Sequence, residues 1–343
     1  MTMIVRPAEE RDIDGLYNLA ETAGTGMTTV PNTRDAIAER VAQSINAIKG
    51  EGRAGPKDTF FFVLDHDGAI HGMASIFPAL GEDRPFYSYR ISKVAAAAPE
   101  LGLQASSDLL YLCNDFHGYT EIGTLLIAKE ARGTAAGRLT SLSRFLFMQT
   151  IKERLGEKIM AEIRGVFRED GTNAFWDGIA SRFFAMSFEE ADKRSAHDFR
   201  FIADLMPKFP IYTALLPDEC RDAIGQAHPT SARAMNMLMS EGMRYTNCID
   251  IFDGGPSLEA PLSSIRTVRE SAQSVVRIQD SIPTEDEHET IVAVPNPKAF
   301  RATVLPRGHQ AGSLFLTAKE ADLLGVKSGD AIITSPFKAR RRG

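Results

Sequence analysis

The sequence predicts an α/β protein, with a mixed β-sheet flanked by helices over residues 1–262 and a small β-rich subdomain over residues 263–343. Three observations carry this prediction. Short apolar strands alternate with amphipathic helices through the first half of the chain, as in mixed α/β sheets. A run of small residues joins one strand to one helix near residue 133. Beyond residue 263 the apolar runs shorten, and an acidic loop, Thr284–Glu289, interrupts them.

The N-terminal part of the chain predicts a strand, two helices and a hairpin. The strand covers residues 3–6, and Asp12 then caps a helix whose apolar stripe is Ile13, Leu16, Leu19 and Ala20. A second helix is expected from Asp35 to about Ile48, because apolar residues recur on one face. Strands at 59–64 and 70–76 are joined by the turn Asp65–Gly68.

The rest of the first domain continues this alternation. We expect residues 108–114 and 121–128 to pair as strands, and a helix to follow from Arg138 to about Leu155. The remaining expected elements are a strand at 158–167, a helix at 173–184, short helices at 199–206 and 218–225, a helix at 231–241 and a strand at 245–252. The arginine-rich tail after Ala339 is expected to be frayed.

The segment Leu125–Leu139 is the most informative stretch of the chain. It predicts a strand, a tight loop and a helix start, and the loop fits the pattern R-x-x-[GA]-x-G with Arg132, Ala135 and Gly137. Such a loop leaves its backbone N–H groups approachable, and the following helix adds the positive end of its dipole. The pattern therefore favours a pyrophosphate site, although a simple turn before a helix has the same appearance.

Composition narrows the function classes. A net charge of −6 disfavours nucleic acid and anionic membranes as partners. The three cysteines, Cys113, Cys220 and Cys248, form no C-x-x-C pair, so the sequence predicts neither a metal site nor a disulfide framework. Their odd number, and the lack of an apolar signal segment near the first residue, favour a reducing cytoplasm. No apolar run approaches the roughly 18 residues of a membrane span.

The order of the expected elements resembles the GNAT superfamily of acyl-CoA N-acyltransferases, which implies a GNAT-like mixed sheet. Longer strings are similar to the arginine N-succinyltransferase family, specifically to the α-type chain of arginine/ornithine succinyltransferase. These strings are Thr25–Pro31, Pro85–Arg90, Cys113–Gly118, Leu139–Phe145, Ala161–Val166, Phe175–Trp176, Leu205–Tyr212, Gly225–Pro229, Glu241–Tyr245 and Ile249–Pro256. The resemblance covers nearly the whole chain to Pro256 and continues weakly beyond it.

The resemblance implies a role for three residues. The family's proton donor is the histidine of a Gln-x-His-Pro motif, which is His228 here; without the resemblance, the residue type alone favours a structural capping or loop histidine. Leu125 carries the family's acyl-CoA contact, which must use its backbone because leucine has no polar side-chain atom. Glu121 begins the same strand, where many relatives place a carboxylate that deprotonates the amine; a solvated strand-end charge is the alternative.

Arg132, Gly133, Ala135 and Gly137 are expected to bind the phosphates of CoA. Ala135 replaces a glycine that many superfamily members carry, and alanine disfavours a positive φ there, but we expect the site to survive. Other candidates follow from charge. The arginines that could bind a substrate carboxylate are Arg90, Arg144 and Arg164. The carboxylates that could bind the guanidinium group of the acceptor are Glu162 and Asp115. His117 and Trp176 are candidates for the wall of the cleft or for a structural role.

The resemblance implies transfer of the succinyl group of succinyl-CoA to the α-amine of L-arginine, as a step of arginine catabolism. Succinyl-CoA would be a co-substrate, with no permanently bound cofactor and no metal. Two alternatives stay open: ornithine, alone or with arginine, as acceptor, or a weakly active subunit that supports a related β chain. Assembly with a second copy or with such a β chain is expected. Residues beyond about 263 are expected to lie outside the catalytic cleft.

Overall fold

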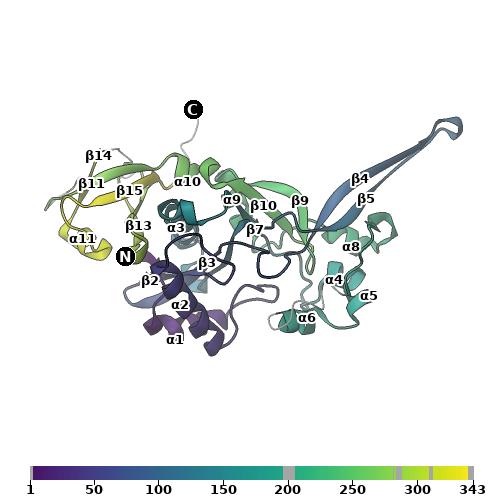
Figure 1. The fold of residues 1–343 in the computed structure, drawn as a ribbon, viewed down its shortest axis with the longest axis horizontal. Helices are drawn as coiled ribbons and strands as arrows, with labels where there is room; N and C mark the ends of the chain where they lie inside the picture. The colour runs from purple at the N-terminus through teal and green to yellow at the C-terminus, as the bar shows by residue number, and fades with distance from the viewer. Residues whose placement is uncertain (1–2, 196–204, 281, 283–287, 309–311, 339–343) are drawn as a thin grey trace.

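One continuous mixed sheet organises the molecule (Figure 1). The computed structural model describes residues 3–195, 205–280, 282, 288–308 and 312–338. Fifteen strands within these ranges are hydrogen-bonded in the order β14-β11-β15-β12-β13-β1-β2-β3-β6-β7-β10-β9-β4-β5-β8. Helices cover both faces, so the α/β mixed sheet that the sequence predicts is confirmed.

The N-terminal elements match their expected ranges closely. Strand β1 covers Met3–Pro7, followed by α1 (Ile13–Ala20) and α2 (Arg34–Lys49). Strands β2 (Phe60–His66) and β3 (Ala69–Phe77) form the predicted hairpin. Its two turn residues, Asp67 and Gly68, both have positive φ, as the right-handed twist of a tight hairpin requires.

The run Phe60–Leu64 explains how the sheet is covered on both faces. Side chains alternate along a strand, so Phe60, Phe62 and Leu64 face α3 (Ala136–Thr150) while Phe61 and Val63 face α1 and α2. All five are fully buried. An unbroken apolar run is the expected pattern for a strand that is buried on both sides.

Strands β4 (Ser88–Ala98) and β5 (Leu103–Cys113) form a long hairpin that projects from the body as an arm (Figure 1). Among the described residues, the arm beyond its base pairs with no other strand: β9 pairs only with Ser88–Arg90, and β8 only with Leu109 and Leu110. The sequence analysis missed β4 and the first half of β5, because their alanine-rich, weakly patterned residues lack the alternation of a half-buried strand.

The predicted pairing of residues 108–114 with 121–128 is wrong. Strand β5 pairs with β4 and β8, whereas β6 (Thr120–Ile127) lies between β3 and β7 (Lys158–Glu162). The connection Asn114–Tyr119 is a tight loop fixed to Leu80, whose carbonyl accepts from Gly118 N and whose N–H donates to Tyr119. Strands β5 and β6 are therefore consecutive in the sequence but are not neighbours in the sheet.

Short helices pack over the sheet near the base of the arm. The predicted helix 173–184 is instead two helices, α4 (Ala174–Gly178) and α5 (Ser181–Phe184). The other short elements here are α6 (Phe188–Ser195), β8 (Ile211–Tyr212), α8 (Asp218–Ala223) and α9 (Ala232–Ser240). Of the predicted helix 199–206, residues 199–204 lie outside the described residues. Trp176 is the centre of this second core and stacks on Phe184 and Phe252.

The chain then returns to the sheet and continues into residues 263–343, the region that the sequence predicts to be a β-rich subdomain. Strands β9 (Arg244–Asp250) and β10 (Pro256–Pro261) come first, and β10 was not anticipated. The subdomain comprises α10 (Arg266–Arg269), β11 (Ala272–Ile278), β12 (Thr290–Ala293), β13 (Ala302–Leu305), β14 (Gly312–Leu316), α11 (Ala318–Leu324) and β15 (Ala331–Pro336). Most of the acidic loop (residues 283–287) and the tail from residue 339 lie outside the described residues.

The β-rich subdomain is joined to the first sheet through its edge. Val5 of β1 pairs with Ala302 of β13, and Thr303 Oγ1 donates to the carbonyl of Met3 at 2.7 Å. Phe300 packs edge-on against Phe62 and Phe147. The two regions therefore share one apolar core. Among the described residues, no helix has the length and apolar character that crossing a membrane requires.

Candidate active site

Strand β6 contains a bulge where the acyl-CoA contact is predicted. Its pairs with β3 join Met73 to Leu126 and Ser75 to Gly123, so two residues, Thr124 and Leu125, oppose a single residue of β3. Thr124 has a left-handed φ of 57°. A bulge of this kind interrupts the ladder and bends the strand.

Beyond the start of β6 the sheet opens. Strands β6 and β7 are parallel, and their described pairs are only Thr120 with Ile159 and Glu121 with Met160. Because the strands then diverge, the backbone of the half-buried Leu125 faces a gap in the ladder instead of a neighbouring strand. Backbone polar groups at such a gap need other partners, and a ligand can supply them.

The predicted phosphate loop leads directly into α3. Thr134 Oγ1 accepts from Ala136 N at 3.2 Å and donates to Ala131 O at 2.7 Å, which fixes the loop. Other amides of the first turn have no acceptor inside the helix, and that turn carries no acidic residue. The positive end of α3 is therefore open to an anion.

The presence of alanine instead of glycine at position 135 introduces no backbone strain in the loop. Ala135 has φ −66° and ψ −14°, an ordinary helical conformation. The positive φ that the loop needs, 82°, falls on Gly133 instead. A Cβ on Gly137 would meet only Ile127, at 3.8 Å, so this face of the helix start is uncovered. Arg132 is exposed and donates from Nε to the carbonyl of Ile127 at the end of β6.

Two buried arginines hold the bulge. Arg40 of α2 donates to the carbonyl of Thr29 and lies over the rings of Phe61 and Phe77. Arg144 of α3 is 1% exposed and donates to the carbonyl of Gly123 at 3.1 Å. Burial lowers the pKa of Arg40 to about 10 and that of Arg144 to about 9, so both stay charged at neutral pH. Arg144, a candidate for a substrate carboxylate, here supports the backbone of β6.

Four carboxylates meet beside the opening of the sheet: the buried Glu121 of β6 and Asp253 of the turn after β9, and the half-buried Glu162 of β7 and Asp250 of β9. The two aspartates organise that turn. Asp250 Oδ1 accepts from the N–H groups of Phe252 and Asp253, and Asp253 Oδ2 accepts from Gly165 N at 2.7 Å. Glu162 Oε1 is buried and accepts no hydrogen bond from a fixed donor, and the Glu162 side chain lies within hydrogen-bond reach of Asp250, to which it can bond when one of the two is protonated.

Burial and mutual repulsion keep protons on this cluster. Burial, offset in part by Arg40, raises the pKa of Glu121 to about 7. Burial first, and then the charges of Asp250 and Glu121, raise the pKa of Glu162 well above its usual value. The pKa values of Asp250 and Asp253 are also raised, mainly by burial. A group of acids with raised pKa values and one oxygen that lacks a fixed donor is suited to receive a cation.

His228 contacts Arg164, which in turn lies near Asp253 of the carboxylate cluster. Its backbone N–H donates to the carbonyl of Arg164 at 2.8 Å, and Arg164 Nη1 lies 3.4 Å from His228 Nδ1. Burial, and then the charge of Arg164, lower the pKa of His228. Thr230 N donates to Nδ1 at 3.2 Å, so the neutral ring carries its proton on Nε2. The ring therefore presents an N–H donor on its other edge.

The remaining candidates lie elsewhere or have structural contacts. Arg90 and Asp115 form an ion pair with each other at the base of the arm. His117 is exposed, with Nδ1 3.2 Å from the carbonyl of Gly81, and Trp176 is buried in the second core. Arg164 and Glu162 are the candidates that the fold brings together with Glu121 and His228.

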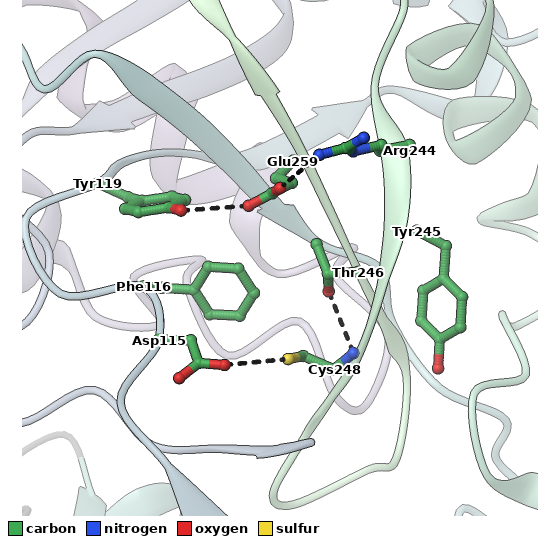
Figure 2. Close-up of a pocket in the computed structure, with 8 residues that line it drawn as sticks. All are labelled: Asp115, Phe116, Tyr119, Arg244, Tyr245, Thr246, Cys248 and Glu259. Carbon is green, nitrogen blue, oxygen red and sulfur yellow. Dashed lines mark hydrogen bonds and ion pairs between the residues drawn. The ribbon is translucent and has the colours of Figure 1, made fainter. Parts of the chain in front are cut away.

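A cavity of about 500 Å³ lies beside the loop Asn114–Tyr119 (Figure 2). Its lining includes Asp115, Phe116, Cys248 and Glu259, but none of Glu121, Leu125, Gly137 and His228. Tyr119 donates to Glu259, which also faces Arg244. The cavity is therefore separate from the candidate active site.

Sequence reasoning missed several residues of the site. Arg40 falls on the buried face of α2 between Ile37 and Val41, and a charge in an apolar stripe is a readable signal. Asp250 and Asp253 lie in a string noted for its resemblance, but their convergence with Glu162 needs the sheet order. No sequence pattern marks Thr29, yet its Oγ1 accepts a hydrogen bond from Thr124 N in the bulge at 3.0 Å.

Known proteins match this chain along nearly its whole length. A family model described as "Arginine N-succinyltransferase beta subunit" matches residues 3–267, and one for the C-terminal domain of the same subunit matches residues 273–336. The chain is 35% identical to the arginine N-succinyltransferase subunit beta of Pseudomonas aeruginosa, covering 99% of this chain and 100% of that one. It is 36% identical to the arginine N-succinyltransferase of Citrobacter koseri, covering 96% of each.

A solved structure shares the whole architecture. The arginine/ornithine succinyltransferase subunit AI of Pseudomonas aeruginosa superposes with a TM-score of 0.87 at 28% identity, covering 98% of this chain and 99% of that one. Both the order of elements and the full-length sequence matches point to one family. The chain belongs to the arginine N-succinyltransferase family.

Proposed function

We propose that this chain transfers the succinyl group of succinyl-CoA to the α-amine of L-arginine, releasing N2-succinyl-L-arginine and CoA, as a cytoplasmic step of arginine catabolism. The names of its relatives support the reaction. The observation that carries the proposal is the buried Oε1 of Glu162, which lacks a fixed donor, within a cluster of acids. This cluster suits a cationic acceptor, as the proposed reaction requires.

The sheet geometry fits the length of arginine. Glu121 pairs with Met160, and Glu162 lies two residues further along β7 on the same face. In a regular parallel ladder such diagonal neighbours have Cα atoms roughly 8 Å apart, and the divergence of β6 and β7 beyond Met160 makes this a lower bound. Six bonds separate the α-nitrogen of arginine from its guanidinium carbon, a span of about 7 Å. We assign the α-amine to Glu121 and the guanidinium to Glu162 on this basis.

Glu121 can act as the base. Its pKa of about 7 lets it accept a proton from the α-ammonium group at neutral pH, and the free amine then attacks the thioester carbonyl. The Nε2–H of His228 would donate to the oxyanion or to the departing thiolate as the intermediate collapses. The C–S bond breaks and the amide C–N bond forms; of the two protons that the α-ammonium group loses, one goes to Glu121 and then to solvent, and the other goes to the CoA thiolate.

Succinyl-CoA is assigned to the opening between β6 and β7, with its thioester beside Leu125. Its pyrophosphate would lie against the amides from Gly133 to Gly137 at the start of α3. Arg132 at the loop edge suits a phosphate. No permanently bound cofactor enters this scheme. Because relatives are named as subunits, assembly with a second copy or a related chain is part of the proposal.

Initial rates with succinyl-CoA and a panel of acceptors test the proposal. L-Citrulline has the shape of arginine but a neutral ureido group, so its kcat/KM should fall by at least about 100-fold, as expected when a site built for a cation meets a neutral analogue. Ornithine deserves a parallel measurement, because one relative's name includes it. Glu162→Gln should lower the ratio of kcat/KM for arginine to kcat/KM for citrulline. Glu259→Gln, which lies outside the cluster, should leave this ratio unchanged.

Three results would count against the proposal. Equal rates with arginine and citrulline would remove the cluster from acceptor recognition. Faster turnover of ornithine would make it the main acceptor. Turnover that appears only after a second family chain is added would favour the supporting-subunit alternative.

A further inference from the structure

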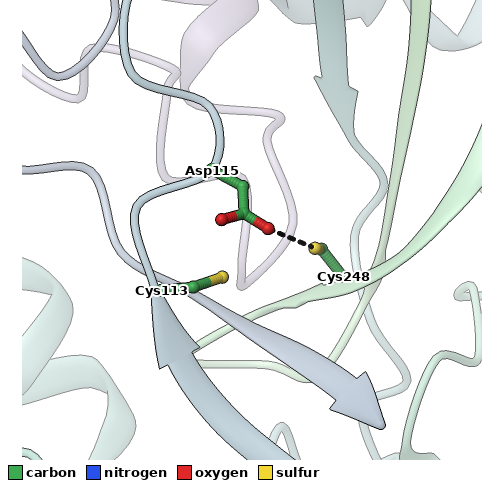
Figure 3. Close-up of side chains that lie close together, drawn as sticks. All are labelled: Cys113, Asp115 and Cys248. Carbon is green, nitrogen blue, oxygen red and sulfur yellow. Dashed lines mark hydrogen bonds between the residues drawn. The ribbon is translucent and has the colours of Figure 1, made fainter.

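Two cysteines that are far apart in sequence meet at the base of the arm (Figure 3). Cys113 ends β5, Cys248 lies in β9, and β4 runs between these two strands. One carboxylate oxygen of Asp115 and the two sulfur atoms all lie within 4.8 Å of one another. The proposed reaction uses none of these three residues, although Cys113 and Asp115 lie in the string Cys113–Gly118.

The sheet register argues against a disulfide between the two thiols. Cys113 pairs with Ser88 and Cys248 with Arg90, so the two cysteines lie two strand spacings apart and two residues out of register, which in a regular ladder separates their Cα atoms by roughly 11–12 Å. A disulfide requires Cα atoms within about 7 Å. The side chains reach toward each other across β4 without being close enough for a bond.

The same spacing suits a bridging ion. Two thiolates bound to one tetrahedral zinc ion at about 2.3 Å each are about 3.8 Å apart. In this structure the two sulfur atoms and a carboxylate oxygen already lie within 4.8 Å of one another, which is compatible with ligands of one ion. Thiolate and carboxylate ligands favour zinc and similar borderline or soft divalent ions over magnesium or calcium.

The surroundings supply the other parts of a metal site. Arg90 Nε donates to Asp115 Oδ2 at 2.8 Å, which orients the carboxylate in the way that outer-shell groups orient metal ligands. Two thiolates, one carboxylate, one divalent ion and the Arg90 cation sum to zero charge. Asp115 and Cys248 also line the cavity of about 500 Å³, which can admit the ion and a water molecule as fourth ligand (Figure 2).

We propose that Cys113, Cys248 and Asp115 form a divalent metal site, occupied by zinc, that joins β5 to β9 across the base of the β4–β5 arm. The third cysteine, Cys220, lies in another core and its thiol faces the carbonyl of Phe175 at 3.9 Å. It therefore provides a matched control within the same chain.

Titration of the tag-free, chelator-treated protein with Co²⁺ tests the proposal. A thiolate-to-cobalt charge-transfer band should appear with one equivalent of Co²⁺ and disappear when Zn²⁺ is added. Cys113→Ser and Cys248→Ser should each remove the band, and Cys220→Ser should retain it. Arg90→Gln should weaken Co²⁺ binding by about 10- to 100-fold, the usual effect of losing an outer-shell partner.

Thermal unfolding provides the second readout. Zn²⁺ should raise the Tm of the wild-type chain and of Cys220→Ser, but not that of Cys113→Ser. Because Cys113 is only half-buried, the Cys113→Ser variant is expected to fold. Absence of a charge-transfer band in the folded wild-type protein would overturn the proposal. So would a band that persists in the Cys113→Ser variant, or formation of a Cys113–Cys248 disulfide under mild oxidation.

Discussion

Thr29 and Thr124 are joined by two hydrogen bonds: Thr124 N donates to Thr29 Oγ1 at 3.0 Å, and Thr124 Oγ1 donates to the carbonyl of Thr29 at 3.1 Å. The pair ties the loop between α1 and α2 to the bulge of β6. Because Thr124 has a positive φ, which is unfavourable for a β-branched residue, the bulge depends on such contacts.

Thr29→Val should therefore loosen the bulge. The side chain keeps its size but loses its acceptor for Thr124 N, so we expect kcat/KM for succinyl-CoA to fall by about 10-fold, equivalent to about 1.4 kcal/mol, the scale of one hydrogen bond. Thr29→Ser keeps the hydroxyl and should retain most of the activity. Equal kinetics for the valine and serine variants would show that the pair is dispensable.

Gly137→Asp tests the phosphate loop. The added Cβ has room, and an acidic residue in the first turn stabilises a helix, so thermal stability should be unchanged or slightly raised. The same charge would repel a pyrophosphate, so the KM for succinyl-CoA should rise by at least about 10-fold. Gly137→Ala adds only the methyl group and should stay close to wild type. An unchanged KM in the aspartate variant would exclude this loop as the phosphate site.

His228 variants separate a chemical role from a structural one. His228→Ala should lower kcat by about 10²–10⁴ with little change in KM, since a transition-state contact is lost. Because the ring offers an N–H donor from Nε2, His228→Gln can supply a similar donor and should recover part of the loss. Wild-type kcat in both variants, with normal thermal stability, would leave the proton chemistry to Glu121 and water.

Glu121 should control the pH dependence of the reaction. With a pKa of about 7, the base form grows as pH rises, so kcat/KM for arginine should increase through pH 7 and level off above pH 8. Glu121→Gln should lose this rise together with most of the activity. A wild-type profile with no inflection between pH 6 and 8 would contradict the assigned pKa.

The same group should make stability depend on pH. The pKa of Glu121 is 4.5 in the unfolded reference and about 7 in the fold, so the native state binds the proton more tightly. Its contribution to stability is complete below about pH 4.5 and is lost as pH rises through 7, by about 3 kcal/mol in total. Calorimetry should therefore show Glu121→Gln melting above the wild type at pH 8, and near it at acid pH. A lower Tm at pH 8 would contradict this sign.

Phe300 tests whether the β-rich subdomain folds separately. Its ring packs on Phe62 and Phe147 in the shared core, so Phe300→Ala should cost about 3–5 kcal/mol of unfolding free energy. We expect one unfolding transition, displaced as a whole, because removing the ring damages both regions. Two separated transitions would indicate that residues 263–343 unfold on their own.

Local chemistry made much of this molecule predictable, and long-range pairing did not. The small-residue loop ending at Gly137 predicted its own helix start, because glycine and alanine act on the backbone that carries them. Glu121 could be placed at the start of its strand for the same reason. The convergence of Glu121 with Asp250 depends on four strands lying in the order β6-β7-β10-β9, which no local pattern encodes.

The arm shows a second kind of failure. Ala95–Ala98 has neither the alternation of a half-buried strand nor the continuous apolar run of a buried one, because neither face of this part of β4 is covered. Burial creates the patterns that sequence reasoning uses, so an uncovered hairpin leaves little trace. The proximity of Cys113 and Cys248 could not be predicted for a related reason, because it depends on β4 pairing with both β5 and β9.

The contact between β1 and β13 determines when the sheet can be completed during synthesis. Met3 and Thr303 are 300 residues apart, and their hydrogen bond lies at the junction of the two parts of the sheet. A ribosome adding 5–20 residues each second needs roughly 15–60 s to make the intervening chain. For that time β1 has β2 on one side and an uncovered edge on the other, so the nascent protein carries a strand edge open to misassociation until its last strands emerge.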